Sequence, residues 1–251
     1  MKTCFHAFCM TQSMFCAIPF PSKIWDEAAR PKMLLFLPLI GLEIGLIWWA
    51  LALLGAFLKL PPLLLAVVLC AAPYVLTGFL HLDGFLDVTD AVRSCRSMEK
   101  RIEILKDPHV GSFAVVGCVL LFLTGFACFA SGVGNAAVLV WIPVVSRCCS
   151  AIAVTACKPI KVSQYAVQQF QKRQTLCLIL QLLLALAAGF LLLGGSAWVL
   201  ILEIGSYALA LRKGYASLGG MNGDISGYAL TISELCALLG AALQTGGVVW
   251  F

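Results

Sequence analysis

The chain has 251 residues, of which 61% are hydrophobic and only 12% are charged, and its formal net charge is +5 at pH 7. An average soluble domain has about 25% charged residues, so this composition excludes an ordinary soluble globular protein and indicates a membrane protein. No basic patch is interleaved with aromatic residues, so the positive charge favours anionic lipid over nucleic acid as its partner.

We expect residues 1–32 to form a cytoplasmic segment at the membrane interface. Thr11, Gln12 and Ser13 interrupt the early apolar stretch, and no small-residue cleavage pattern follows. We therefore expect these residues to remain in the mature protein and not to act as a signal peptide. The next stretch, IPFPSKIWDEAARPK, is too polar to span a bilayer, and Trp25 beside charged residues is typical of an interfacial position.

Seven apolar runs follow, and a spanning helix needs about 20 mostly apolar residues. The runs cover residues 33–58, 61–80, 110–130, 136–157, 175–193, 197–211 and 226–250. Hydrocarbon offers backbone amides no hydrogen-bond partner, and unbroken apolar runs lack the alternation of barrel strands, so the runs predict helices. The expected fold class is all-α: a polytopic integral membrane bundle of about seven transmembrane helices. The connecting segments are too small for a soluble core, so we expect residues 1–251 to form a single integral membrane domain.

Basic residues predict which loops face the cytoplasm, because short cytoplasmic loops are rich in Lys and Arg. With the N-terminus inside and seven spans, the opposite side holds Lys59 alone, and the other loop Lys and Arg residues, Lys23 and Lys161 included, are cytoplasmic. The same arrangement brings the segments 81–109 and 212–225 to one face of the membrane. We expect these two segments to form the active-site loops.

The stretch HLDGFLDVTD places three aspartates at spacings of four and three. Asp83, Asp87 and Asp90 would share one face of a helix, where their charges repel each other unless a cation binds. Mg²⁺ prefers carboxylate oxygens and shares its remaining positions with water and substrate phosphates. We therefore predict a metal site, with His81 one turn earlier to accept a proton or donate a hydrogen bond. The alternative is a helix end that turns polar on leaving the membrane.

Two later segments supply candidate contacts for an anionic substrate. Arg101 and Lys106 are candidates for phosphate contact, and Asp107, a further candidate, opens the turn before the next span. The stretch LGGMNGDISG has glycines that let backbone N–H groups face an anion. Its candidate contacts are Gly219, Gly220, Asn222 and Gly223. Asp224 is expected to be either a fourth metal ligand or the N-cap of the last helix, for which Ser226 is the alternative.

Four charged residues lie inside the predicted spans, where charge is costly unless it meets a partner or a cavity. They are Glu43, Arg147, Glu203 and Glu234. The guanidinium of Arg147 suits either an anionic substrate or an ion pair with one of the glutamates. The same four residues would line the path of a transporter, although no inverted repeat of hydropathy supports that function.

The stretches HLDGFLDVTDA, RIEILKDPHVGSF and LGGMNGDISG, in that order, resemble the three signatures of the cobalamin synthase family, the adenosylcobinamide-GDP ribazoletransferases. FCAIPFP and FLPLIGLEIG resemble the amino-terminal region of that family, so the resemblance covers nearly the whole chain. It implies an enzyme integral to the bacterial cytoplasmic (inner) membrane, with its active site facing the cytoplasm.

The resemblance also implies the reaction. The enzyme would transfer the adenosylcobinamide-phosphate moiety of adenosylcobinamide-GDP to α-ribazole or its 5′-phosphate, release GMP, and require Mg²⁺. The product would be adenosylcobalamin or its 5′-phosphate, formed in the last steps of vitamin B12 biosynthesis. Another Mg²⁺-dependent membrane transferase acting on diphosphates, such as an aspartate-rich prenyltransferase or a CDP-alcohol phosphotransferase, is the nearest alternative. The sequence leaves open whether the protein forms a homo-oligomer.

Overall fold

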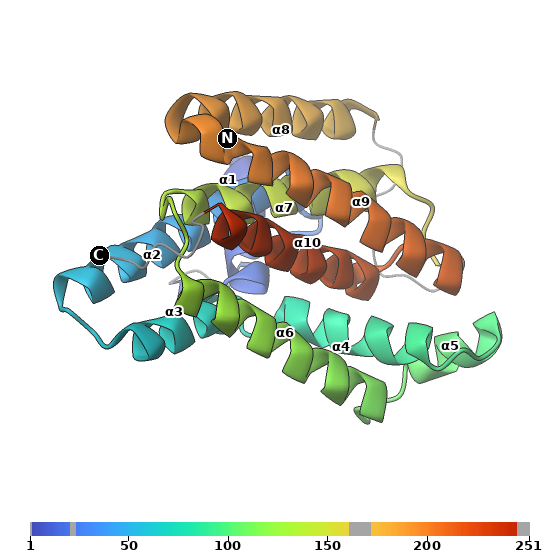
Figure 1. The fold of residues 1–251 in the computed structure, drawn as a ribbon. Coiled ribbons are helices and arrows are strands. Elements are labelled where there is room, and N and C mark those ends of the chain that lie inside the picture. Colours follow the sequence, from blue (N-terminus) through green and yellow to red (C-terminus); the bar gives the residue numbers. More distant parts are fainter. Residues whose placement is uncertain (1, 21–23, 161–171, 245–251) are drawn as a thin grey trace.

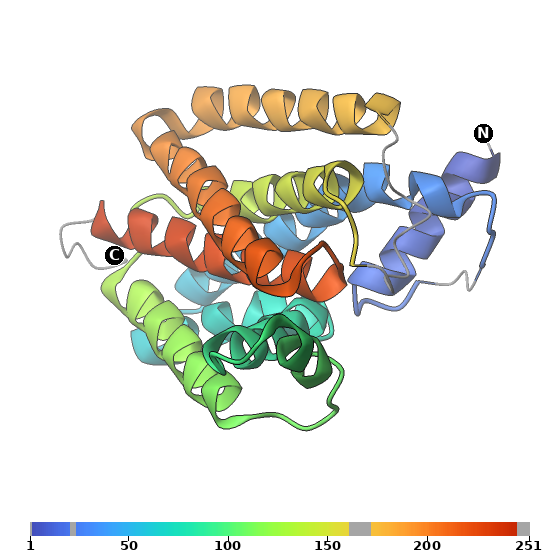
Figure 2. The same ribbon diagram turned by 90° about the vertical axis from the view of Figure 1, so that its right-hand side faces the viewer.

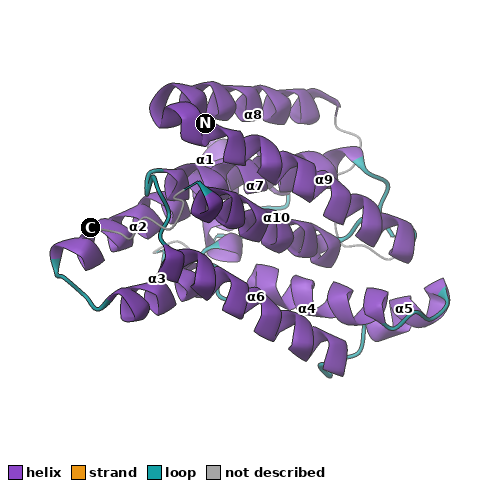
Figure 3. Cartoon of the chain, in the orientation of Figure 1, coloured by secondary structure: helices purple, strands orange, loops and turns teal. Residues whose placement is uncertain are grey.

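The computed structural model describes residues 2–20, 24–160 and 172–244, and these ranges fold into helices joined by short connections (Figures 1 and 3). The elements are α1 (Lys2–Phe15), η1 (Arg30–Phe36), α2 (Leu37–Phe57), α3 (Pro62–Leu76), α4 (Leu80–Arg93), α5 (Met98–Ile104), α6 (Ser112–Ser131), α7 (Val138–Ala156), α8 (Lys172–Leu193), η3 (Gly194–Ala197), α9 (Trp198–Leu218) and α10 (Gly223–Leu243). This confirms the all-α fold class. Lys23, Lys161 and residues 245–250 of the last predicted span lie outside the described residues.

The described residues hold five helical runs that are long and apolar enough to cross a membrane, or six when α3 and α4 are counted together as one broken span. One of the five, Lys172–Leu218, contains both α8 and α9. The chain reverses direction between these two helices at η3, as Figure 1 shows. The seven predicted spans therefore correspond to α2, α3, α6, α7, α8, α9 and α10, which agrees with a polytopic membrane bundle.

The second predicted span, 61–80, ends earlier than expected, at Leu76. Gly78 and Phe79 both adopt left-handed backbone conformations, with φ of 58° and 62°, and α3 and α4 are bent by 91° relative to each other. Glycine accepts this conformation without strain, whereas phenylalanine does so at a cost. The three aspartates of α4 would be costly in hydrocarbon, so α3 is the part of the pair that suits the membrane interior and α4 suits the membrane surface.

Helices α7 and α10 form the centre of the bundle. In their most apolar stretches 89% and 72% of the residues are buried, whereas the figure for α6 is 28%. Helices α2 and α8 pack on α7, and α4 and α9 pack on α10. The outer helices expose leucines such as Leu123 and Leu184, as expected for helices that face lipid.

The connections after α4 and α9 and the segment 157–160 after α7 lie together at one end of the bundle (Figures 1 and 2). The backbone N–H of Met221 donates to the carbonyl of Lys158 at 2.8 Å, and that of Ile160 donates to the carbonyl of Met221 at 3.0 Å. Arg101 donates to the carbonyl of Ser217 at 3.5 Å. The α2–α3 connection, which includes Lys59, lies at the opposite end (Figure 1). Arg96, Arg101, Lys106 and Lys158 therefore lie at one end of the bundle, whereas Lys59 lies at the other.

Candidate active site at the basic end of the bundle

Two glycines let α4 and α10 approach each other closely. A Cβ atom built on Gly84 would lie 2.9 Å from both the Cα and the carbonyl oxygen of Asp224. A Cβ atom on Gly227 would lie 3.1 Å from the carbonyl oxygen of His81. Side chains at these positions would push the helices apart, because backbone atoms cannot rotate out of the way. The glycines therefore bring Asp224 against the turn of α4 that carries Asp83 and Asp87.

The start of α10 orients Asp224. Asn222 is the N-cap: its side-chain oxygen accepts a hydrogen bond from the N–H of Ile225 at 2.9 Å, and its amide donates to Oδ2 of Asp224 at 2.7 Å. The expectation that Asp224 or Ser226 caps this helix is wrong, because α10 begins at Gly223, three residues before the predicted start of the span. Ser226 instead shares a 2.6 Å hydrogen bond with Ser150 of α7. Because Asn222 caps the helix, the carboxylate of Asp224 does not serve as the N-cap.

The negatively charged aspartates of α4 and α10 lie close enough to repel one another. Burial and then, in decreasing order, the negative charges of Asp83, Asp224 and Asp90 together raise the pKa of Asp87 to about 6. Asp83 is exposed and the other three are half-buried. Asp90 lies beside the start of α6, where its carboxylate occupies the space that a Cβ on Gly111 would need.

The carboxylate side chains are not arranged as a complete set of metal ligands in this structure. Within the part of the chain that the structure describes, no three Asp, Glu, His or Cys side chains are grouped closely enough to hold a metal ion. The acidic face of α4 and the start of α10 are therefore neighbours whose side chains must rotate to share one cation. Such rotation is available to half-exposed aspartates on a helix surface.

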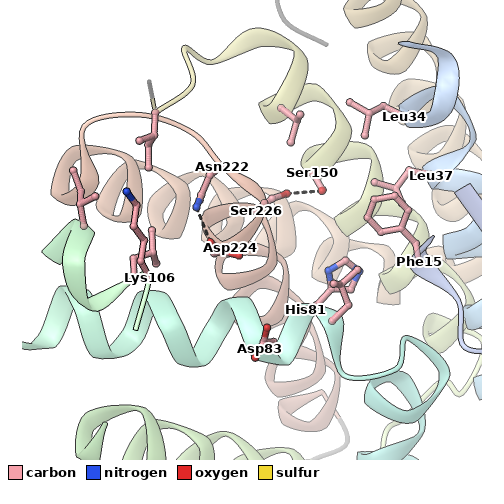
Figure 4. Close-up of a pocket in the computed structure, with 16 residues that line it drawn as sticks. Phe15, Leu34, Leu37, His81, Asp83, Lys106, Ser150, Asn222, Asp224 and Ser226 are labelled. Atoms are coloured by element: carbon pink, nitrogen blue, oxygen red, sulfur yellow. Dashed lines mark hydrogen bonds between the residues drawn. The ribbon is translucent and has the colours of Figure 1, made fainter. Parts of the chain in front are cut away.

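A cavity of about 370 Å³ opens beside these aspartates, with acidic, basic and apolar groups on its wall (Figure 4). Its lining includes six residues predicted from the sequence: His81, Asp83, Lys106, Asn222, Gly223 and Asp224. It also includes residues that sequence reasoning missed: Phe15, Leu34, Leu37, Leu80, Ile102, Leu105, Ser150, Val154, Ile160 and Ser226. Most of these are apolar residues in apolar helices, so they carry no signal. A signal existed for Ser150 and Ser226, which are polar residues in predicted spans.

His81 lies at the buried side of the cavity. Its side chain is buried, its Nε2 atom has no hydrogen-bond partner, and its ring stacks on Phe15 with centroids 6.2 Å apart. Burial and, to a smaller extent, the positive charge of Arg147 together lower the pKa of His81 to about 3. The imidazole is therefore neutral at physiological pH and is a weak proton acceptor, but it remains free to form one hydrogen bond with a bound molecule.

Arg147 lies in the interior, with 1% of its surface exposed, and forms an ion pair with Glu234. Ser146 donates a hydrogen bond to the same glutamate at 2.8 Å. Of the two functions that the sequence left open for Arg147, the ion pair is the one observed. The pair spans the two central helices, α7 and α10, and breaking it would leave an uncompensated buried charge.

The other predicted contacts lie around the cavity and do not line it. Arg101 holds the end of α9 through Ser217, and Asp107 accepts hydrogen bonds from His109 on an exposed turn. Gly219 ends α9 with φ of 74°, a conformation that favours glycine. Gly220 packs against the backbone of Pro159. These residues shape the segment between α9 and α10.

The fold and the site define a class: a polytopic helical membrane protein with a cavity at one end, in which coupled carboxylates and a lysine adjoin an apolar wall. Comparison with known proteins narrows the class. The chain belongs to the cobalamin-5-phosphate synthase family, whose model matches residues 7–242.

Curated relatives agree over almost the full length. A protein of Clostridium perfringens (strain SM101 / Type A) is 36% identical, over 95% of this chain and 98% of its own. A protein of Clostridium botulinum (strain Alaska E43 / Type E3) is 33% identical, over 98% and 100%. One of Stutzerimonas stutzeri (strain A1501) is 34% identical, over 92% of each chain. All three are named adenosylcobinamide-GDP ribazoletransferase. No solved structure matches the chain.

Proposed function

We propose that this protein is an adenosylcobinamide-GDP ribazoletransferase. It joins the adenosylcobinamide-phosphate part of adenosylcobinamide-GDP to α-ribazole or its 5′-phosphate, and it releases GMP. The observation that carries this proposal is the family match over residues 7–242, together with relatives of that name that align end to end. The cavity supports it, because coupled carboxylates and Lys106 suit a diphosphate substrate, whereas the apolar wall suits an uncharged group.

We further propose that Mg²⁺ is the cofactor. The donor chemistry fits: Asp83, Asp87 and Asp224 are carboxylates on neighbouring turns of two helices. Burial and then the charges of the other aspartates raise the pKa of Asp87, and a cation would remove that repulsion. Asp90, one turn further along α4, would complete the set. A bound Mg²⁺ would neutralise negative charge on the diphosphate oxygens.

The protein's own groups position the reactants and accept a proton. A ribose hydroxyl of the ribazole attacks the phosphorus attached to cobinamide, its oxygen forms the new P–O bond, and the P–O bond to GMP breaks. Asp83 is exposed at the cavity and has two carboxylate oxygens, so one would remain free to accept the hydroxyl proton while the other binds the cation. His81 is the less suitable base, since its pKa of about 3 lets it hold a proton only weakly. Lys106 contacts phosphate from the end of the α5 segment.

We propose that the cavity faces the cytoplasm of a bacterium. The support is the clustering of basic connections at the end of the bundle where the cavity lies, since such connections stay cytoplasmic. Adenosylcobinamide-GDP and the released GMP are charged and would be available on that side. The bilayer itself covers the exposed leucines of the outer helices.

The test is a direct assay of the purified full-length protein in a detergent or nanodisc. With Mg²⁺, adenosylcobinamide-GDP and α-ribazole, the wild type should release GMP, and release should require both substrates. The Asp83→Asn variant should insert and purify normally but lose turnover at ordinary Mg²⁺ concentrations. The matched control is Glu99→Gln, a change at an exposed acid of α5, which should keep wild-type turnover. Absence of GMP release by the wild type would refute the proposed function.

A further inference from the structure

The cavity has a second, apolar end that the phosphate chemistry does not use. Phe15 of α1, Leu34 of η1, Leu37 of α2 and Val154 of α7 line it, and each is buried. Figure 4 shows Phe15, Leu34 and Leu37 grouped beside His81, across the cavity from Asn222 and Lys106. The two ends therefore differ in chemistry: one suits charged oxygens, and the other suits an uncharged, apolar group.

His81 gives the apolar end a single polar feature. Its ring lies nearly parallel to that of Phe15, with 15° between the two planes. Its Nε2 atom is buried and has no partner. A buried polar atom without a partner is unfavourable in the free protein, and a bound molecule with one suitably placed atom would satisfy it. The site thus calls for a flat ring with one hydrogen-bonding atom.

We propose that this end of the cavity binds the aromatic base of the ribazole acceptor. That base is a dimethylbenzimidazole: it is flat and uncharged, it carries two methyl groups, and it has one ring nitrogen that is not bonded to ribose. Phe15 and the aliphatic side chains contact the ring and its methyl groups, and the Nε2–H of His81 donates a hydrogen bond to the free ring nitrogen. The inference rests on the proposed function and assigns the acceptor's place within the cavity.

The other parts of the substrates fit this end poorly. The edges of guanine carry several donors and acceptors, and these would lose their water partners against Leu34, Leu37 and Val154. Ser150 and Ser226, between the two ends in Figure 4, already bond to each other at 2.6 Å. The corrin macrocycle with its side chains is too large for a cavity of about 370 Å³. The base of the acceptor is the remaining group, and its placement directs the ribose toward Asp83 and Asp224.

The first test separates the two Michaelis constants. GMP release by the full-length protein is measured with α-ribazole varied at saturating adenosylcobinamide-GDP, and then the reverse. Phe15→Leu keeps an apolar side chain but removes the ring, and it should raise the KM for α-ribazole about five- to tenfold. The KM for adenosylcobinamide-GDP should stay within about twofold of wild type. A larger rise in the second constant, or no change in the first, overturns the proposal.

The matched control is Phe129→Leu, because Phe129 is a buried phenylalanine of α6 that does not line the cavity. It should leave both Michaelis constants at the wild-type values. An equal rise in the KM for α-ribazole in this variant would also count against the proposal, since the effect would then reflect a general loosening of the bundle.

The second test examines the hydrogen bond with a change in the acceptor. In the dimethylindole riboside, a C–H group replaces the free ring nitrogen of the base. The wild type should use this analogue at least tenfold less efficiently, in kcat/KM, than α-ribazole. His81→Leu, which replaces an unpartnered polar group by an apolar one, should use the two acceptors equally well. If His81→Leu still discriminates, or the wild type does not, the hydrogen bond is wrongly assigned.

The outcomes also distinguish this inference from the proposed function. A wild type that releases no GMP from the two substrates refutes the function itself. A wild type with normal turnover, combined with a Phe15→Leu variant that has an unchanged KM for α-ribazole, refutes only the assignment of the apolar end.

Discussion

Replacing Asp87 by Asn should make the metal-free protein more stable and, at the same time, inactive. In the folded protein the pKa of Asp87 rises from 3.8 to about 6, chiefly through burial and then through the neighbouring aspartates. A rise of this size corresponds to about 3 kcal/mol of destabilisation of the charged form. Because Asp87 is half-buried, screening by water reduces this figure to about 1 kcal/mol.

The pH dependence has a defined sign. An acid whose pKa is higher in the folded state binds its proton more tightly there, so ionisation destabilises the fold. For Asp87 the destabilisation grows as pH rises from 3.8 to about 6 and is complete above that value. The Asn variant should therefore exceed the wild type in stability at pH 7.5, and the difference should shrink as the pH falls toward 4.

The assay is thermal unfolding in detergent without divalent metal. A gain of about 1 kcal/mol should raise the midpoint of Asp87→Asn by about 2–4 °C. Adding Mg²⁺ should raise the midpoint of the wild type more than that of the variant, because the variant lacks one ligand. The matched control, Glu99→Gln, should behave like the wild type. Equal stability of variant and wild type without metal, or an equal response to Mg²⁺, would refute the reasoning.

Three further predictions test the site. Gly84→Ala should reduce activity at least tenfold and destabilise the protein by about 1–3 kcal/mol, since its Cβ would lie 2.9 Å from the backbone of Asp224. The control is Gly205→Ala, where no atom lies within 4 Å of the added Cβ, and it should leave activity unchanged. Equal effects of the two variants in kinetic and unfolding assays would contradict the close packing of α4 on α10. Lys106→Ala should raise the KM for adenosylcobinamide-GDP several-fold by removing a phosphate contact. Lys100→Ala, on the same segment, should leave this KM unchanged. Similar Michaelis constants for both variants would exclude the contact between Lys106 and phosphate. EDTA should abolish GMP release and Mg²⁺ should restore it; activity that persists in EDTA would remove the metal from the mechanism.

The sequence shows that charged residues lie inside the bundle, but it does not show which of them form ion pairs. Arg147, Glu203 and Glu234 lie on three different helices, and a buried charge signals only that some partner is near. The structure pairs Arg147 with Glu234 and leaves both carboxylate oxygens of Glu203 without a hydrogen-bond partner. Partner choice depends on the rotation of each helix about its axis, which packing against neighbours determines.

The N-cap of α10 shows a local error with a local cause. Asp224 and Ser226 are both good capping residues, but Asn222 takes the role because the turn after Gly219 lets the helix start at Gly223. The sequence offered several capping residues within five positions. Gly220 packs against the backbone of Pro159 just before this helix, a contact between distant segments that the local sequence does not indicate.

The sequence by itself determined the helical membrane fold, because long apolar runs in hydrocarbon can satisfy their backbone only as helices. It also determined the acidic face of α4, since spacings of four and three fix which residues are neighbours on one helix. Only the tertiary structure decided that Asp224 lies against this face, that Gly84 and Gly227 permit the approach, and that Phe15, Leu37 and Val154 close the apolar end of the cavity. These contacts join residues from different helices, and a chain's local pattern carries no information on which distant apolar faces will meet.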